Sequence, residues 1–441
     1  MRKAAAVRNG PAPSVEGSLA AIKAMNGKLN AFNIVLSDED VARTSGGKGP
    51  LAGLPVGVKD IIDVAGLPTG AGSLTRKGTA PAERDAFCVA RLKAAGAVVV
   101  GKTNTVEYAL GGWGTNYAVG TPRNPWDMKV ARTPGGSSSG SGVAVSTGIV
   151  PAALGSDTGG SVRLPASWCG CVGLKTSIGL IGRSGVVPLS TTLDTVGPLT
   201  DTVRRAAELL AVMQGEDAAD PSTHGVKRGD PLASLERGVL GLRIGLVGGE
   251  DTKGASPETR DALAKAAKLL AEAGASVVPF KMPLAPELLL ARCGSLITVE
   301  AYATYRRLVD DPKSALDIHI RRRMLDGKGI SAADLVAGEQ ERARVRDSFL
   351  WAMDRLDVIL LPTTATTAIK LTEVDERVSP GLYTRFVNYL ELCGLALPMG
   401  RGTSGLPTSV QIVGRKLDDP LVLRAGQALE GARGALPRPK V

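Results

Sequence analysis

The chain has 441 residues, of which 44% are hydrophobic and 22% are charged, and this composition excludes a wholly disordered or collagen-like protein. Its formal net charge of +10 raises the question of a nucleic-acid partner. However, the densest basic run, Arg321 to Arg323, reads as a solvated helix face, and aromatic residues make up only 3% of the chain. Because base stacking needs aromatic residues among the basic ones, we predict no nucleic-acid partner.

The soft metal ligands are few and scattered. The five cysteines show no disulfide-framework spacing, and the histidines are His224 and His319 alone. We therefore predict a cytoplasmic protein without a metal or other cofactor. No apolar run reaches the roughly 18 residues that a membrane-spanning helix needs, so we expect no membrane association.

Short apolar strands and amphipathic helices alternate along much of the chain. In chain order we predict a helix at 19–26, a strand at 55–59, a helix at 84–95, a strand at 97–100, a helix at 202–214, a strand at 242–247, a helix at 257–273, a strand at 276–280, helices at about 285–310 and 332–355, and a strand at 357–361. This alternation predicts an α/β fold whose sheet is covered on both faces. No segment clearly divides the chain, and 215–236 is the best candidate for a linker.

Residues 133–182 are unusually poor in charge. They carry only Asp157, Arg163 and Lys175, which predicts that this segment lies in the interior. Because a buried charge is costly unless it is paired, these three residues are candidates for a polar network.

Two Gly-Gly-Ser turns lie in this charge-poor segment, at 135–137 and 159–161. Such glycines let backbone amides turn toward a substrate oxygen, as an oxyanion hole requires, although flexible linkers have a similar composition. A phosphate-binding loop is excluded because no Lys followed by Ser or Thr comes after the glycines. Residues 136–140 also match G-x-S-x-G, with Ser138 as nucleophile and His224 or His319 as base, but 128–134 is a poor strand for such an elbow.

Taken together, the motifs resemble the amidase signature family over most of the chain, from Leu29 to Gln411. The resemblance rests on an ordered series: PLAGLPVGVKD at 50–60, GLPTG at 66–70, KTNTVEY at 102–108, the Gly/Ser block, and the segment 165–175. The family usually has glycine where Ser139 stands and threonine where Ser156 stands. The resemblance implies an α/β/α fold with a central mixed β-sheet. It implies one domain over 1–441, with an N-terminal segment at 1–50, the signature core at 51–200 and the remainder at 201–441.

The resemblance further implies a Ser-Ser-Lys triad. Ser161 is then the acyl-accepting nucleophile, Ser137 the bridging serine behind a cis peptide after Gly136, and Lys59 the base. A lysine serves as a base only when neutral, and we expect desolvation in the charge-poor segment to lower its pKa.

The same resemblance assigns roles to the second glycine turn. The oxyanion hole would be formed by the backbone amides of Thr158, Gly159, Gly160 and Ser161. Ser138, Asp157 and Arg163 would hold this loop, although a salt bridge buried for packing alone would leave the same residues.

For activity, the resemblance implies a hydrolase of linear amide C–N bonds. We expect a small or aryl carboxamide or carbamate (urethane) as substrate and a covalent acyl-Ser161 intermediate, with Trp113, Tyr117 and Trp168 as candidates to line an apolar pocket. The alternative is the amidase subunit of a glutamine-dependent tRNA amidotransferase, which would need partner subunits. A homo-oligomer stays open.

Overall fold

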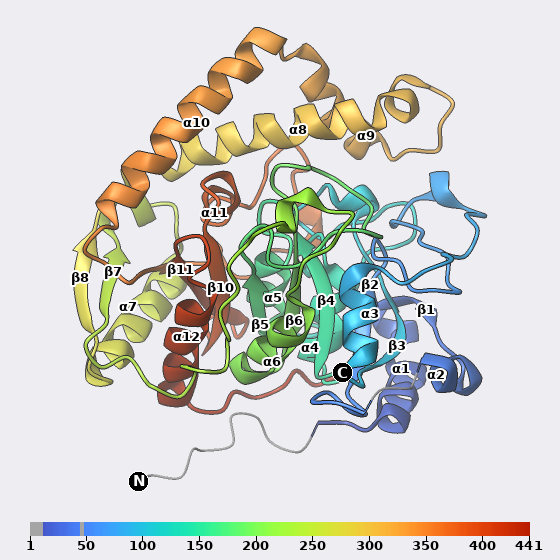
Figure 1. Ribbon diagram of the computed structural model, residues 1–441, viewed down its shortest axis with the longest axis horizontal. Helices are drawn as coiled ribbons and strands as arrows, with labels where there is room; N and C mark the ends of the chain where they lie inside the picture. The colour runs from blue at the N-terminus through green and yellow to red at the C-terminus, as the bar shows by residue number, and fades with distance from the viewer. Residues whose placement is uncertain (1–11, 45–47) are drawn as a thin grey trace.

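A computed structural model describes residues 12–44 and 48–441, so parts of the predicted N-terminal segment, 1–11 and 45–47, lie outside the described residues. Within the described residues one mixed sheet runs through the molecule (Figure 1). Across the sheet the strands are β1 (Phe32–Val35), β3 (Val98–Thr103), β2 (Pro55–Lys59), β4 (Ala152–Asp157), β6 (Thr195–Thr200), β5 (Val172–Lys175), β10 (Cys393–Arg401), β11 (Pro407–Gly414), β9 (Val358–Pro362), β7 (Arg243–Val247) and β8 (Ser276–Phe280). Strand β2 is parallel to β3 and β4, whereas β6 is antiparallel to β4 and β5.

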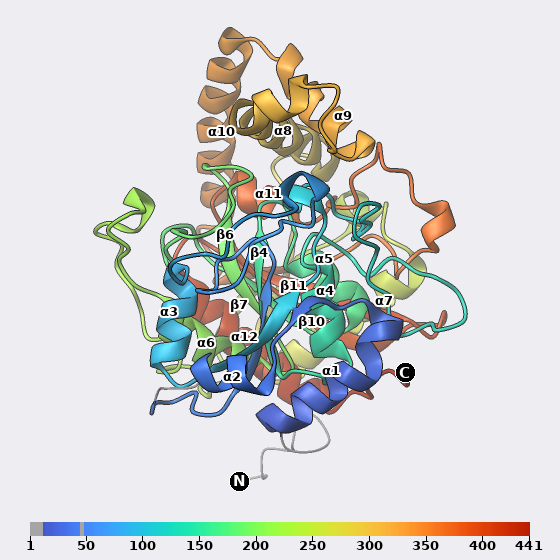
Figure 2. The same ribbon diagram turned by 90° about the vertical axis from the view of Figure 1, so that its right-hand side faces the viewer.

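Helices cover both faces of this sheet (Figure 2). On one side lie α1 (Val15–Leu29), α4 (Ser139–Ser146) and α5 (Arg163–Cys169), and on the other α3 (Phe87–Ala94), α6 (Val203–Met213) and α12 (Asp419–Arg433). Helix α2 (Asp38–Thr44) packs beside β3, and α7 (Pro257–Glu272) packs against β9 and β11. Short 3-10 turns occur at η1 (Leu74–Arg76), η2 (Glu107–Ala109), η3 (Pro221–Thr223), η4 (Gly249–Thr252), η5 (Gly327–Gly329) and η6 (Leu371–Glu373). The predicted α/β/α fold with a mixed sheet is confirmed.

The predicted elements agree with the observed ones to within a few residues. Strands β2 and β8 have the predicted bounds, and α7 ends one residue earlier than expected. Gly96, with φ of 93°, ends the turn after α3, because only glycine adopts this backbone without cost. Strand β3 continues to Thr103, three residues beyond the prediction, because parallel pairing with β2 holds Lys102 and Thr103 in the sheet.

A helical layer lies over one end of the sheet, uppermost in Figure 1. It consists of α8 (Pro286–Asp310), α9 (Ile318–Asp326), α10 (Ala332–Ala352) and the short α11 (Arg385–Tyr389). Helix α8 contacts both α9 and α11. This layer places α8 and α11 close to the glycine-rich loops of the core.

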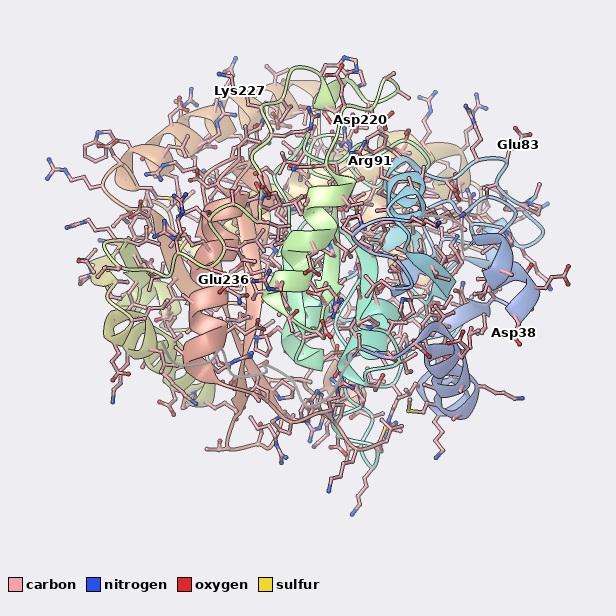
Figure 3. The ribbon with its side chains drawn as sticks, turned by 60° about the horizontal axis from the view of Figure 1, so that its bottom comes forward. Asp38, Glu83, Arg91, Asp220, Lys227 and Glu236 are labelled. Carbon is pink, nitrogen blue, oxygen red and sulfur yellow. The ribbon has the colours of Figure 1, made fainter. Side chains whose placement is uncertain are left out.

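The candidate linker at 215–236 lies along the core. Asp220 pairs with Arg183 at 2.9 Å, and Glu236 accepts hydrogen bonds from Arg204 and Gln427. Figure 3 shows Lys227 of this segment pointing outward, as do Asp38 and Glu83 elsewhere. Acidic and basic side chains therefore both lie on the surface of the molecule.

Candidate active site

Lys59 lies at the end of β2 and is fully buried. Its Nζ is 2.6 Å from Ser137 Oγ and 2.8 Å from Ser156 Oγ. Burial lowers the pKa of Lys59 to about 7, although the negative charges of Asp194 and Asp157 act in the opposite direction. Near neutral pH the amine is therefore neutral in a large share of molecules, as a proton acceptor must be.

The turn that carries Ser137 is held by backbone contacts on both sides. The Gly136–Ser137 peptide bond is cis, and the Ser137 carbonyl accepts hydrogen bonds from Val106 N and Thr105 Oγ1. Ser138 donates from its amide to the Ser161 carbonyl at 3.1 Å. This last bond joins the first Gly-Gly-Ser turn to the second.

Ser161 lies between β4 and α5, and 8% of its surface is exposed. It faces a cavity of about 490 Å³ that Thr158, Gly159 and residues of α8 also line. Neither Lys59 nor Ser137 lines this cavity. The serine hydroxyl is thus reachable by a small molecule from one side, while the lysine stays shielded on the other.

The backbone amides around Ser161 do not all have the same role. We expected four backbone amides in the oxyanion hole. The amide of Gly160 instead donates to Asp157 Oδ1 at 2.7 Å. The amides of Thr158, Gly159 and Ser161 form no hydrogen bond within the described part of the chain. Three amides are therefore available to an oxygen at this loop.

Asp157 and Arg163 form a buried ion pair beneath the loop. Asp157 Oδ1 lies 3.0 Å from Arg163 Nη2, and both side chains are fully buried. Burial alone would raise the pKa of Asp157, but the charge and hydrogen bonds of Arg163 lower it to about 2. Lys175 lies near the pair, donates to the Leu392 carbonyl and has a pKa that burial lowers to about 8. Asp157 and Arg163 are thus paired directly, whereas Lys175 acts on them only through its charge.

Three supporting residues were not identified from the sequence. Asp194 accepts a hydrogen bond from Thr158 Oγ1 at 2.5 Å, and burial raises the pKa of this carboxyl. Thr384, at the start of α11, donates to the Gly159 carbonyl at 2.8 Å, and Asn388 donates to Asp157. These residues lie far from the glycine-rich motifs in the sequence, so spacing alone carries no signal for them.

The three aromatic residues proposed for a substrate pocket lie elsewhere. Trp113 stacks on Trp168 with ring centroids 5.5 Å apart, and the Trp168 indole donates to the Thr366 carbonyl. Tyr117 is 60% exposed and donates to Glu376. None of the three lines the cavity beside Ser161. The cavity walls come instead from small and aliphatic residues and from several charged side chains.

The nucleophile-elbow alternative does not fit the structure. In the described part of the chain no strand leads directly into Ser138, which caps α4. Its fully buried hydroxyl bonds to the Ser156 backbone. Neither His224 nor His319 lines the cavity beside Ser161. Across residues 12–44 and 48–441, no three His, Cys, Asp or Glu side chains come close enough to hold a metal ion. In the same residues, no helix combines the length and apolar character of a membrane span.

Comparison with curated proteins finds extensive similarity. The chain is 35% identical to the A subunit of glutamyl-tRNA(Gln) amidotransferase from Acidobacterium capsulatum, over 95% of this chain and 94% of the relative. It is 38% identical to the protein of the same name from Anaeromyxobacter sp. (strain K), over 96% and 93%.

Solved structures agree with this similarity. The A subunit of glutamyl-tRNA(Gln) amidotransferase from Thermotoga maritima superposes with a TM-score of 0.85 at 34% identity, over 97% of this chain and 94% of that one. A structure described as a vestigial complex bearing on the origins of an s-triazine catabolic enzyme gives 0.88 at 33%, over 97% and 96%. A bacterial aryl acylamidase gives 0.85 at 26%, over 95% and 92%.

The match to a known protein family covers the region in which all of these site residues lie. The family model described as Amidase matches residues 14–423. Its span includes the loops of Lys59, Ser137 and Ser161 as well as α8 and α11. The chain therefore belongs to the amidase family.

Proposed function

We propose that this chain is a serine amidase that releases ammonia from a carboxamide through an acyl-Ser161 intermediate. The observation that carries the proposal is the buried Lys59 amine at 2.6 Å from Ser137 Oγ, on a loop bonded to that of Ser161. A serine hydroxyl is a weak nucleophile until a base takes its proton. A largely neutral lysine, relayed by the Ser137 hydroxyl, supplies that base.

In the proposed reaction Ser161 Oγ attacks the carboxamide carbon while its proton passes through Ser137 to Lys59. The oxyanion that forms accepts hydrogen bonds from the amides of Thr158, Gly159 and Ser161. The C–N bond then breaks, the relay returns the proton to the leaving nitrogen, and ammonia departs. Water, deprotonated by the same relay, attacks the ester carbonyl, and the acid and the Ser161 hydroxyl are released.

The relatives favour one physiological role over the other. The curated relatives that we compared are amidotransferase subunits, and they match along nearly the whole chain. This supports a role as the ammonia-releasing subunit of a glutamine-dependent amidotransferase, rather than our expectation of an aryl amide or carbamate hydrolase. The likeness to an aryl acylamidase keeps the free-standing hydrolase as the second candidate.

Ammonia release from glutamine, compared with release of aniline from acetanilide and hydrolysis of an aryl carbamate, tests the two roles. The purified protein and its Ser161→Ala variant would be assayed side by side. The amidotransferase role predicts Ser161-dependent release from glutamine and none from the aryl compounds. Aryl amide or carbamate turnover without glutamine turnover would establish the second candidate instead. Release that survives Ser161→Ala would refute the acyl-Ser161 mechanism.

A further inference from the structure

Arg385 is the unusual charge in the cavity beside Ser161. It is the first residue of α11, and its side chain lines the cavity together with Gly159, Ser161 and α8. The guanidinium donates from Nη1 to the Leu290 carbonyl at 3.1 Å. Among the described residues no carboxylate forms an ion pair with Arg385, and this bond to Leu290 is the one that its side chain makes.

The other charged residues of the cavity are differently placed. Arg323 pairs with Glu376, and it also donates to the Leu110 carbonyl at 2.8 Å. Arg377 pairs with Asp375 at 2.8 Å, and its side chain is 70% exposed. Asp326 lines the cavity from its exposed rim. The Arg385 cation is thus the one in this wall that lacks a carboxylate partner.

Three glycines leave room for the Arg385 side chain beside the nucleophile loop. A Cβ at Gly159 would lie 3.1 Å from Arg385 Cγ, and a Cβ at Gly381 would lie equally close to the same atom. At Gly294 of α8 a Cβ would lie 2.6 Å from Nη1. The arginine therefore runs directly past the loop and against the helix. Gly159 is two residues from Ser161, so their Cα atoms are at most about 7 Å apart.

Arg385 is partly buried. A charge that is partly withdrawn from water without a partner is costly, because a guanidinium stays protonated at any physiological pH. Burial and the charge of Arg323 lower the pKa of Arg385. A planar, forked donor matches a carboxylate, which it binds through two parallel hydrogen bonds. A carboxylate entering the cavity would therefore complete the ion pair that the protein itself leaves unmade.

We propose that Arg385 binds a carboxylate on the acyl part of the substrate, so that the preferred substrates are short carboxamides with an anionic far end. This inference rests on the proposed amide hydrolysis and names its substrate class. The acyl side is assigned because the cavity adjoins Ser161 and Gly159, whereas Lys59 and Ser137, which serve the leaving nitrogen, do not line it. Succinamate, glutaramate and glutamine belong to this class.

Calorimetric titration with glutarate tests the subsite without any turnover. Glutarate would be titrated into the Ser161→Ala protein, with Arg385→Gln or Arg377→Gln added. The matched control Arg377→Gln removes one positive charge from the same cavity wall. We expect Arg385→Gln to weaken glutarate binding roughly tenfold to a hundredfold, and Arg377→Gln to weaken it by less than about threefold. Unchanged binding in Arg385→Gln, or equal losses in both variants, would overturn the proposal.

Kinetics with the Ser161 enzyme form the second arm. For glutaramate, Arg385→Gln should lower kcat/KM by a similar factor, mainly through KM. For pentanamide, which lacks the carboxylate, kcat/KM should stay unchanged. Equal losses on both amides would overturn the proposal while leaving amide hydrolysis intact. If no amide is turned over, the proposed function fails, and the glutarate titration still decides the subsite.

Gly294→Ala tests the same subsite in case Arg385→Gln fails to fold. The added methyl group would overlap the Arg385 guanidinium and would meet no other side chain within 4 Å, so the displaced cation keeps its charge. The account predicts the same selective loss for glutarate and glutaramate, with a melting temperature close to that of the parent protein. Full glutarate affinity in Gly294→Ala would contradict the geometry on which the proposal stands.

Discussion

The buried lysine predicts a specific pH dependence. Burial lowers the pKa of Lys59 from 10.5 to about 7, so the amine loses its proton as pH rises through neutrality. If the neutral amine is the base, the rate follows its fraction, which is about one half at pH 7, about one tenth at pH 6 and about one hundredth at pH 5. The rate of Ser161 acylation should therefore fall tenfold per pH unit below about pH 6 and level off above about pH 8.

The rate of inactivation by a fluorophosphonate, measured from pH 5 to 9, reports on this step without knowledge of the substrate. Lys59→Arg serves as the control, because a guanidinium keeps its proton throughout this range and cannot act as the base. The Lys59→Arg variant should be inactivated slowly, and its rate should not change near pH 7. A wild-type profile that stays flat between pH 5 and 9, or a Lys59→Arg profile equal to it, would refute the assignment of Lys59.

Three further predictions concern stability and the loop. Because the folded-state pKa of Lys59 lies below its unfolded value, protonation of the unfolded chain opposes folding by on the order of 5 kcal/mol at pH 7, and this cost disappears as pH rises toward 10.5. Lys59→Met should therefore be inactive. Its free energy of unfolding in urea at pH 7 should exceed that of wild type by about 2–3 kcal/mol, once the loss of the lysine's hydrogen bonds is subtracted, and by less at pH 9. Equal differences at both pH values would contradict this cause. Asp157→Asn leaves the Arg163 charge buried without its counter-ion and should cost roughly 3–5 kcal/mol in the same assay, whereas Asp375→Asn on the surface should change little. Gly160→Ala should lower the acylation rate at least tenfold, since Gly160 has φ of 131° and a Cβ would overlap the Thr384 hydroxyl; Gly431→Ala in α12, with open space around it, should be neutral or stabilising.

Local patterns in the sequence were enough for part of the regular elements. The strand at 55–59 and the helix after Ser256 follow from alternation and from a capping serine followed by proline, signals that act within a few residues. Strands β1, β5, β10 and β11 were not predicted. Strands β4 and β6 were also missed, because their glycine, serine and proline content resembles that of turns. Their buried, antiparallel pairing, from Ala152 opposite Thr200 to Asp157 opposite Thr195, is a tertiary effect.

The candidate site was accessible from sequence only through the ordered motifs. They single out Lys59 at the end of β2, Ser137 just before α4 and Ser161 between β4 and α5. The charge-poor segment explains why the lysine is desolvated. Asp194 and Arg385 lie outside these motifs and come to the loop through the fold. A single sequence offers no pattern that links residues so far apart. The aromatic residues near the motifs do not line the cavity beside Ser161, because nearness in sequence does not decide which side of a loop faces a cavity.

Intact-mass spectrometry after fluorophosphonate treatment tests the central claim most directly. Wild type, Ser161→Ala and Ser138→Ala would be treated in parallel, since Ser138 is the nucleophile of the competing interpretation. The account predicts one adduct on wild type and on Ser138→Ala, and none on Ser161→Ala. An adduct that persists on Ser161→Ala and disappears from Ser138→Ala would contradict the account.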